Sequence, residues 1–328
     1  MSIPAKKKVG VVLLQLGGPD SLDAVEPFLY NLFSDPDIID LPGAGVEREP
    51  LVRRMAASRA RKVQECYAAI GGKSPIGEWT HRQARALEET LRRSLDARVV
   101  VAMRYWHPLT AEAIAELVRG SYSELVLLPL YPQYSKTTTG SSLNEWRRQS
   151  ANSALSSLPV KMIPDFHAHP GYIRAVVERI AATLPKFSEP GQVHLVFSAH
   201  GVPISVIESG DPYQAQVEAT VREVLEQGRW GLPHTVCYQS QVGPGRWLEP
   251  SLHAVIAQWG SQGAPDVLIV PISFVSDHIE TLYEIDIEVR EEAKQAGFRQ
   301  LEMMPGLNDS PQFVQALADL VLKAVFSN

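Results

Sequence analysis

Cysteine is scarce in this sequence, with Cys66 and Cys237 as the two examples among 328 residues. Two thiols are too few for the disulfide framework of a small secreted domain. They are also too few for an iron–sulfur cluster held by the usual four cysteines. A metal ion that this chain binds must therefore be coordinated by histidine, aspartate or glutamate side chains.

The chain also lacks an excess of basic residues and long apolar runs. The chain has 31 Lys and Arg against 37 Asp and Glu, a net charge of -6, whereas a general nucleic-acid binder carries a basic footprint. No run reaches the roughly 18 apolar residues of a transmembrane helix. The apolar run Val9–Leu16 enters a Gly-Gly-Pro turn without a small-residue cleavage site, so we expect a buried strand and a cytoplasmic protein.

One segment could still touch a membrane surface, because apolar side chains crowd the region after that first turn. Asp35, Asp37 and Asp40 interrupt the segment. The alternative is an amphipathic helix and loop packed on their own domain. Peripheral membrane contact is thus one of two predictions for these apolar residues: Phe28, Leu29, Leu32, Phe33, Ile38, Ile39 and Leu41.

Short β-branched runs alternate with longer helical stretches, which predicts parallel sheets with crossover helices. With 45% apolar residues, the chain can bury two cores. We expect two similar α/β domains, residues 1–166 and 167–328, with the last helix free to pack on the N-terminal domain, and a monomer. The expected strands are Val9–Leu16, Arg98–Arg104, Glu124–Leu130, Val160–Ile163, Val193–Ala199, Thr235–Gln239, Val267–Ser273 and Gln300–Met304.

His200 stands directly after one of these strands, beside Gly201. Ligands of open parallel sheets bind beyond the carboxyl ends of the strands, so this histidine is placed to face one. A neutral imidazole can accept a proton or bind a metal. The alternative, a histidine hydrogen-bonded into the domain structure, stays open on position alone.

Glutamates recur every four residues after the strand Val267–Ser273, at Glu280, Glu284 and Glu288. At 3.6 residues per turn this spacing places the three carboxylates on one face of an α-helix. Like charges at that spacing repel, so the face is either solvated or used by cations or protons. Asp277 with Glu280 could instead be an N-cap and its capping box.

Taken together, eight blocks spread over the chain resemble ferrochelatase, the enzyme family that inserts ferrous iron into a porphyrin to make haem. The most specific are FSAHGVP at Phe197–Pro203 and PISFVSDHIETLYEIDIE at Pro271–Glu288. The others are VVLLQLGGPDS at Val11–Ser21, YAAIGGKSPI at Tyr67–Ile76, MRYWHPLT at Met103–Thr110, YPQYSKTTTGSS at Tyr131–Ser142, GDPY at Gly210–Tyr213 and YQSQVGPGRWLEP at Tyr238–Pro250.

The resemblance implies two Rossmann-like, chelatase-like domains with a porphyrin cleft between them. It implies that His200 and Glu280 are the catalytic metal-site pair, with His200 accepting a pyrrole proton. It further implies a proton or metal path and a set of porphyrin-binding residues. The path would contain Asp277, His278, Glu284 and Glu288, and the porphyrin would meet Arg59, Tyr67, Ser74, Arg104, Tyr105, Trp247 and the packing residue Leu16.

The same resemblance implies Fe²⁺ and protoporphyrin IX as substrates, in the last step of haem synthesis. The first turn resembles the protoporphyrin-using branch, and coproporphyrin III is the alternative. Some relatives hold a [2Fe–2S] cluster on cysteines of a C-terminal tail. This chain ends at Asn328 without that tail and carries Lys136 where such relatives can have cysteine, so no cluster or other resident cofactor is expected.

Metal insertion needs no nucleotide, and the Gly17-Gly18-Pro19 turn lacks both phosphate-loop patterns, so the reaction is expected to be independent of ATP. A non-catalytic tetrapyrrole or metal carrier with the same fold is an alternative function. A chelatase for another metal, such as cobalt or nickel, is a further one.

Overall fold

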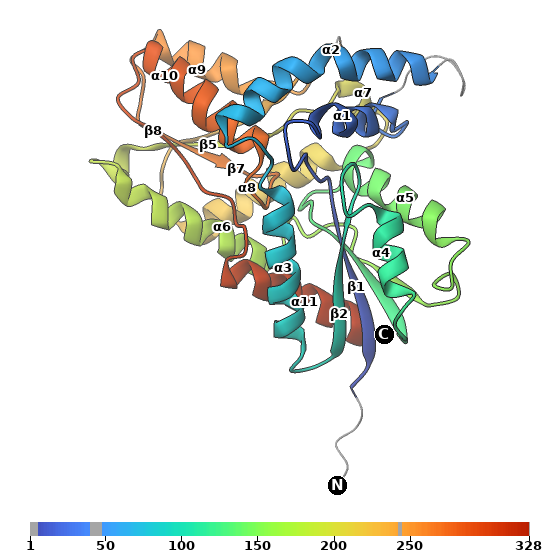
Figure 1. The fold of residues 1–328 in the computed structure, drawn as a ribbon. Helices are drawn as coiled ribbons and strands as arrows, with labels where there is room; N and C mark the ends of the chain where they lie inside the picture. Colours follow the sequence, from blue (N-terminus) through green and yellow to red (C-terminus); the bar gives the residue numbers. More distant parts are fainter. Residues whose placement is uncertain (1–5, 40–47, 242–244, 328) are drawn as a thin grey trace. The chain divides into compact units, whose positions relative to one another are not determined.

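The computed structural model describes residues 6–39, 48–241 and 245–327. By internal packing the chain forms two units, residues 1–165 with 308–328 and residues 166–307. Each unit contains one four-stranded sheet in which every pairing is parallel. The predicted fold class, two α/β domains with parallel sheets flanked by helices, is confirmed (Figure 1).

The sheet of the first unit has the strand order β2-β1-β3-β4. The central strands are continuous apolar runs, and all six residues of β3 are buried. A strand reads this way when helices cover both faces of its sheet. The strands are β1 (Lys8–Gln15), β2 (Asp96–Met103), β3 (Glu124–Pro129) and β4 (Val160–Met162).

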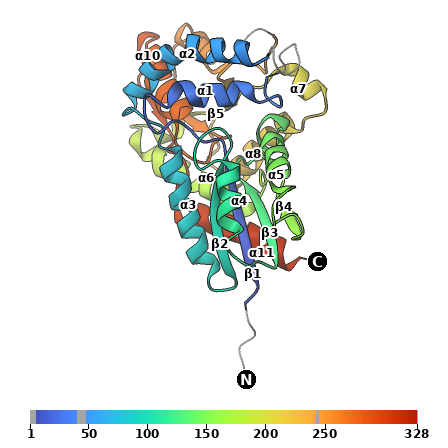
Figure 2. The same ribbon diagram turned by 45° about the vertical axis from the view of Figure 1, so that its right-hand side comes forward.

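Helices cover both faces of this sheet, with α3 and α11 on one face and α4 and α5 on the other (Figures 1 and 2). Val12 and Leu14 of β1 share a core cluster with Ile114 of α4 and Trp146 of α5. The helical elements of this unit are α1 (Val25–Ser34), α2 (Arg48–Ala69), α3 (Ile76–Leu91), α4 (Thr110–Leu117), the π-helix η2 (Lys136–Gly140), α5 (Ser141–Ser150) and α11 (Pro311–Phe326).

The second unit repeats the plan with the order β6-β5-β7-β8. Val196 and Ile269 of its central strands pack with Ile256, Ile285 and Ala293 from α9, η5 and α10. Its strands are β5 (His194–His200), β6 (His234–Gln239), β7 (Val267–Pro271) and β8 (Leu301–Met303). Its helical elements are α6 (Pro170–Thr183), η3 (Leu184–Lys186), η4 (Pro190–Gln192), α7 (Ile204–Glu208), α8 (Tyr213–Gly228), α9 (Leu252–Gly260), η5 (Glu280–Val289) and α10 (Arg290–Gln295).

Part of the apolar segment after the first turn is buried, whereas Leu32, Ile38 and Ile39 are half-buried. Phe28, Leu29 and Phe33 on α1 are each no more than 6% exposed. These rings and side chains are therefore already covered by protein. Leu41 lies outside the described residues. Among the residues that the structure describes, no helix combines the length and apolar character that crossing a membrane requires.

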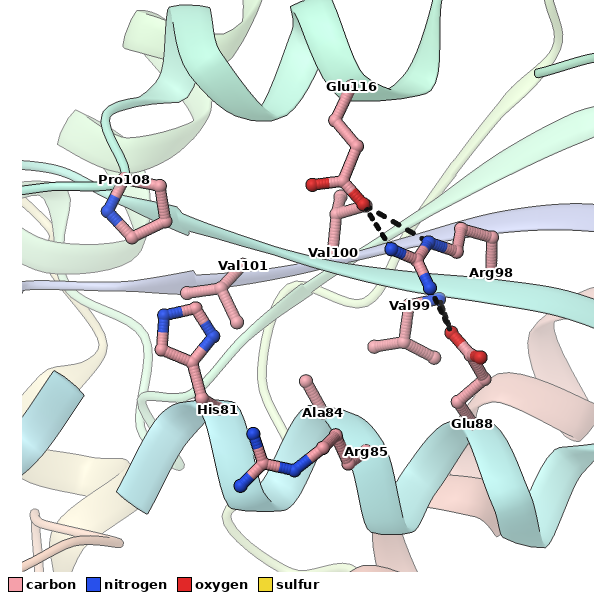
Figure 3. A pocket seen from close by; sticks show the side chains of 10 residues that line it. All are labelled: His81, Ala84, Arg85, Glu88, Arg98, Val99, Val100, Val101, Pro108 and Glu116. Carbon is pink, nitrogen blue, oxygen red and sulfur yellow. Dashed lines mark hydrogen bonds and ion pairs between the residues drawn. The ribbon is translucent and has the colours of Figure 1, made fainter. Parts of the chain in front are cut away.

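A polar cavity of about 170 Å³ lies in the first unit, among α3, β2 and α4 (Figure 3). The Arg98 guanidinium donates to Glu116 at 2.6 Å, and Glu88 accepts from the Val99 N–H at 2.9 Å. These bonds join β2 to the helices on its two sides, which gives the charges a structural task. The lining residues are His81, Ala84, Arg85, Glu88, Arg98, Val99, Val100, Val101, Pro108 and Glu116.

Candidate active site

His200 is the last residue of β5, and its backbone and ring are held on three sides. Its N–H donates to the Ser273 hydroxyl at 2.9 Å, and its carbonyl accepts from the Tyr213 hydroxyl at 3.0 Å. Its Nδ1 lies 2.6 Å from the Gly201 carbonyl. Because a carbonyl can only accept, Nδ1 is the protonated nitrogen, and Nε2 is left to face the site.

Position 201 requires glycine because another backbone segment approaches it closely. A Cβ there would lie 2.8 Å from the Gln239 carbonyl and 3.4 Å from the Trp247 ring. The Gly201 N–H donates to the same carbonyl at 2.7 Å. The close approach ties the end of β5 to the end of β6 and places Trp247, a predicted porphyrin residue, beside the His200 segment.

Glu280 begins η5 and meets His200 across the site. The distance from His200 Nε2 to Glu280 Oε2 is 3.7 Å, and His278 Nε2 lies 3.8 Å from the same oxygen. These separations are longer than a hydrogen bond. They are short enough for one divalent ion, about 2.1 Å from each ligand atom, to bridge His200 and Glu280. The structure thus brings together the two residues predicted as the metal pair.

The Glu280 carboxylate stays charged although it is largely buried. Burial by itself raises the pKa of such a group, but the electrostatic effects of the nearby His200 and His278 side chains, with the Ser240 hydroxyl, outweigh it. The pKa of Glu280 is lowered to about 2. Burial and the neighbouring Glu280 charge raise the pKa of Glu284. The two carboxyl groups therefore differ in their affinity for a proton.

The prediction of an ordinary α-helix for the glutamates is wrong, because residues Glu280–Val289 form a π-helix. At its end the Arg290 N–H donates to the Ile285 carbonyl, five residues back. At its start the Gln239 side chain donates to the Glu280 carbonyl at 3.1 Å. The widened turn still leaves Glu280 and Glu284 on a shared side, since both carboxylates reach the Ser240 hydroxyl, at 3.4 and 2.5 Å.

The other predicted path residues have different surroundings. His278 is buried beside Phe274, with ring centroids 4.5 Å apart. Asp277 is also buried, and its Oδ1 accepts from the Gly306 N–H at 3.0 Å and from the Thr281 hydroxyl at 3.4 Å. Those bonds anchor the entry to η5. Glu288 is exposed, so the side chains of Glu280, Glu284 and Glu288 run from the buried pair toward solvent.

A second group of predicted residues lies in the first unit, after β1 and β2. Arg104 forms an ion pair with Asp35 at 2.9 Å and donates to the Ser141 hydroxyl at 2.9 Å. Tyr105 is 1% exposed and donates its hydroxyl to Asp35 at 2.5 Å. Both side chains thus converge on one buried carboxylate.

The remaining predicted porphyrin residues surround the Gly17-Gly18 turn or lie on α2. A Cβ on Gly18 would lie 2.6 Å from Ser74, so the turn packs directly on that serine. The Leu16 carbonyl accepts from the Tyr105 N–H at 3.0 Å. Tyr67 on α2 is 2% exposed, and the Arg59 guanidinium lies 5.4 Å from the centre of the Phe33 ring.

Sequence reasoning missed the residues that support the metal pair. Tyr213 and Ser273 bond the His200 backbone, and the ring of Phe274 lies 6.3 Å from that of His200. Ser240 binds both Glu280 and Glu284. Each follows a strand or begins a helix at the carboxyl edge of the sheet. That position in the sequence could have identified them as candidates for the site. Over the described part of the chain, no cluster of three or more His, Cys, Asp or Glu forms a metal centre.

Solved structures with a similar fold include SirB and CbiX. SirB from Bacillus subtilis with Fe³⁺ superposes with a TM-score of 0.56 at 12% identity, covering 98% of this chain and 96% of that one. CbiX, described as the terminal enzyme for biosynthesis of siroheme in denitrifying bacteria, gives 0.50 at 16% identity, covering 97% and 99%. At such identities the likeness concerns the fold alone.

Sequence relatives narrow the class. The sequence model of the ferrochelatase family matches residues 8–325. A ferrochelatase of Aquifex aeolicus (strain VF5) is 48% identical, covering 97% of this chain and 100% of the relative. One of Trichodesmium erythraeum (strain IMS101) is 46% identical, covering 97% and 83%. The chain belongs to the ferrochelatase family and is a metal-inserting lyase of haem biosynthesis.

Proposed function

We propose that this enzyme inserts Fe²⁺ into protoporphyrin IX to give protohaem, without ATP, and that His200 and Glu280 carry the insertion. The observation that supports the pair is the 3.7 Å separation of His200 Nε2 from Glu280 Oε2. Imidazole and carboxylate are ligands that Fe²⁺ accepts. A two-residue site suits a metal substrate, because the ion must leave it for the porphyrin.

The two carboxyl groups supply different chemistry in this proposal. Glu280, with its lowered pKa, is charged at neutral pH and attracts the cation. His200 accepts a pyrrole proton through Nε2, since its Nδ1 is committed to the Gly201 carbonyl. Glu284, with its raised pKa, is the neighbouring group that takes a proton more readily. Asp277, His278 and Glu288 complete the proposed proton or metal path.

The porphyrin-binding assignments stay predictions for Arg59, Tyr67, Ser74, Arg104, Tyr105, Trp247 and Leu16. Of these, Tyr105, Tyr67 and Ser74 are buried, which favours an indirect contribution through packing. The preference for protoporphyrin IX over coproporphyrin III rests on the Gly17-Gly18-Pro19 turn. The absence of a [2Fe–2S] cluster, the monomeric state, the membrane contact and the cytoplasmic location also stay predictions.

Anaerobic incubation with Fe²⁺ and each porphyrin in turn tests the proposal. We expect the Soret and Q bands of protoporphyrin IX to change to those of the metallated product at a higher kcat/KM than those of coproporphyrin III, with no ATP in the buffer. A faster reaction with coproporphyrin III would overturn the substrate assignment. No metallation of either porphyrin, with tight binding retained, would favour the carrier function.

The proposed path has its own test at limiting iron. Glu284→Gln should lower kcat/KM for Fe²⁺ by roughly tenfold, the effect of one charge-assisted interaction. The exposed Glu288→Gln should have a smaller effect in the same direction. The matched control is Glu291→Gln, because Glu291 is an exposed glutamate on the following helix α10 and has no predicted role. Equal rates for all three variants would leave the glutamates as a solvated face.

A further inference from the structure

Ser240 has an unusual backbone conformation next to the metal pair. It follows β6 directly and has φ +62°, in the left-handed region that side chains other than Gly, Asn and Asp rarely adopt. A strained conformation of this kind persists only when the surroundings hold it, and such residues cluster at functional sites. The strain alone assigns no role, so the contacts of the residue decide.

The left-handed turn directs two donors of Ser240 at one carboxylate. Its N–H donates to Glu284 Oε1 at 2.8 Å, and its hydroxyl donates to Glu284 Oε2 at 2.5 Å. The same hydroxyl lies 3.4 Å from Glu280 Oε2. In this conformation one residue bonds both oxygens of Glu284, one through its backbone and one through its side chain.

We propose that Ser240 is a positioning residue for iron transfer, holding the Glu284 carboxylate beside the His200–Glu280 pair through its hydroxyl. The inference rests on the proposed function of that pair. Without the hydroxyl, Glu284 keeps a single bond from the Ser240 N–H and can rotate about it. Delivery of Fe²⁺ then slows, whereas the porphyrin, which Ser240 is not proposed to contact, binds as before.

Three substitutions separate the hydroxyl from the backbone. Ser240→Gly and Ser240→Ala both remove the hydroxyl, but glycine adopts a positive φ freely and alanine does not. Ser240→Thr keeps the hydroxyl and adds strain, because a β-branched residue is poorly suited to that region. If activity depends on the hydroxyl, the Thr variant should be active and the Gly and Ala variants impaired. If activity depends on the backbone conformation, the Gly variant should be active and the Ala and Thr variants impaired.

We expect kcat/KM for Fe²⁺ to fall about tenfold in both Ser240→Gly and Ser240→Ala, and Ser240→Thr to keep most of the wild-type value. The Kd for porphyrin, measured by fluorescence quenching, should stay within about twofold of wild type in all three. Tm should be higher for the glycine variant than for the alanine variant, although their rates are equal.

Arg229→Gly is the matched control for the backbone. Arg229 is exposed and has φ +51° at the end of α8, away from the glutamates. Relief of its conformation should change Tm without changing kcat/KM for Fe²⁺. Wild-type kcat/KM in Ser240→Gly would overturn the positioning role, as would a parallel fall in porphyrin affinity. If the wild-type protein metallates no porphyrin, the proposed function fails instead, which is a separate result.

Discussion

At Glu280, burial and two neighbouring histidines act on a single carboxyl group in opposite directions. Desolvation favours the neutral form, and the electrostatic effects of His200 and His278 favour the anion, which prevails. Glu280 is therefore ionised although its burial removes most of the solvation that usually stabilises a carboxylate. The charged carboxylate is the form of Glu280 that binds a cation.

His200→Ala tests the residue at the centre of this arrangement. Removal of the imidazole takes away the proposed proton acceptor and one metal contact. We expect kcat for iron insertion to fall by roughly 10² to 10⁴, the range for a general base, while porphyrin Kd changes little. An equal loss of porphyrin binding in fluorescence titrations would assign His200 a structural role.

His194, at the opposite end of β5, provides a test of pH dependence. Burial, and to a lesser degree the charge of His234, lower the pKa of His194 below 6.5, and its Nε2 lies 2.9 Å from the Thr235 hydroxyl. The folded state thus binds this proton less tightly than the unfolded state. The associated stability is present above pH 6.5 and is lost as pH falls through that value toward the lowered pKa.

Replacement of His194 by glutamine removes this titration. The wild-type Tm should fall between pH 7 and pH 5, and His194→Gln should fall by less over the same interval. Thermal scans at half-unit pH steps measure the difference. Parallel curves for the two proteins would show that the protonation of His194 does not contribute.

At the scale of secondary-structure elements, a buried ionic contact in the first unit joins α1, β2 and α5. Asp35 ends α1, Arg104 and Tyr105 follow β2, and Ser141 begins α5. The Asp35 carboxylate is fully buried and accepts from all three of these partners. A buried carboxylate is tolerated only with such complete pairing. The contact orders the loops at the carboxyl ends of β1 and β2.

Asp35→Asn should therefore destabilise the first unit. The amide cannot neutralise Arg104, which keeps only the more distant Glu145 carboxylate at 3.9 Å. Loss of the closer charged partner costs about 1.5 to 3 kcal/mol. Urea unfolding followed by circular dichroism measures it. Asp37→Asn is the control, because Asp37 bonds the exposed Asn144, and a surface change of this kind stays within about 0.5 kcal/mol. Similar midpoints for the two variants would contradict the argument.

The strands were predicted well and the helices less evenly. All eight expected strands are present within about two residues of their predicted ends, because a buried parallel strand is a short apolar run. The π-helix η5 was not predicted. Glutamates four residues apart lie on a shared side of either helix type, so the pattern could not distinguish them. Contacts such as that of Gln239 with the Glu280 carbonyl come from distant parts of the chain.

At the scale of the whole molecule, the C-terminal segment groups with the N-terminal unit and not with the unit that precedes it in the chain. The last helix, α11, belongs to the unit built mainly from the first 165 residues. It packs against α3, β3 and β4 and buries Phe313, Leu317 and Val321. The final segment of the chain thus completes the core that the first segment began.

Leu317→Ala tests that contribution. Leu317 is 0% exposed, and truncation of such a core leucine costs about 2 to 5 kcal/mol. Hydrogen exchange should quicken in β3 and α3 of the first unit and stay unchanged in β5 and β7 of the second. Gln315→Ala, on the exposed side of the same helix, is the control. Faster exchange in the second unit alone would show that α11 does not stabilise the first.

The class of fold and the position of the strands followed from the sequence, because burial patterns are local properties of the chain. The candidate pair His200 and Glu280 followed from the resemblance of their sequence blocks to ferrochelatase, since position after a strand left other roles open. The tertiary structure alone decided how those residues act. In it the Nε2 atoms of His200 and His278 both lie near one Glu280 oxygen. The glutamates lie on a π-helix, and Ser240 bonds Glu284. The contacts of His200 with Glu280 and of Ser240 with Glu284 join residues more than 40 positions apart, whose geometry no local pattern encodes.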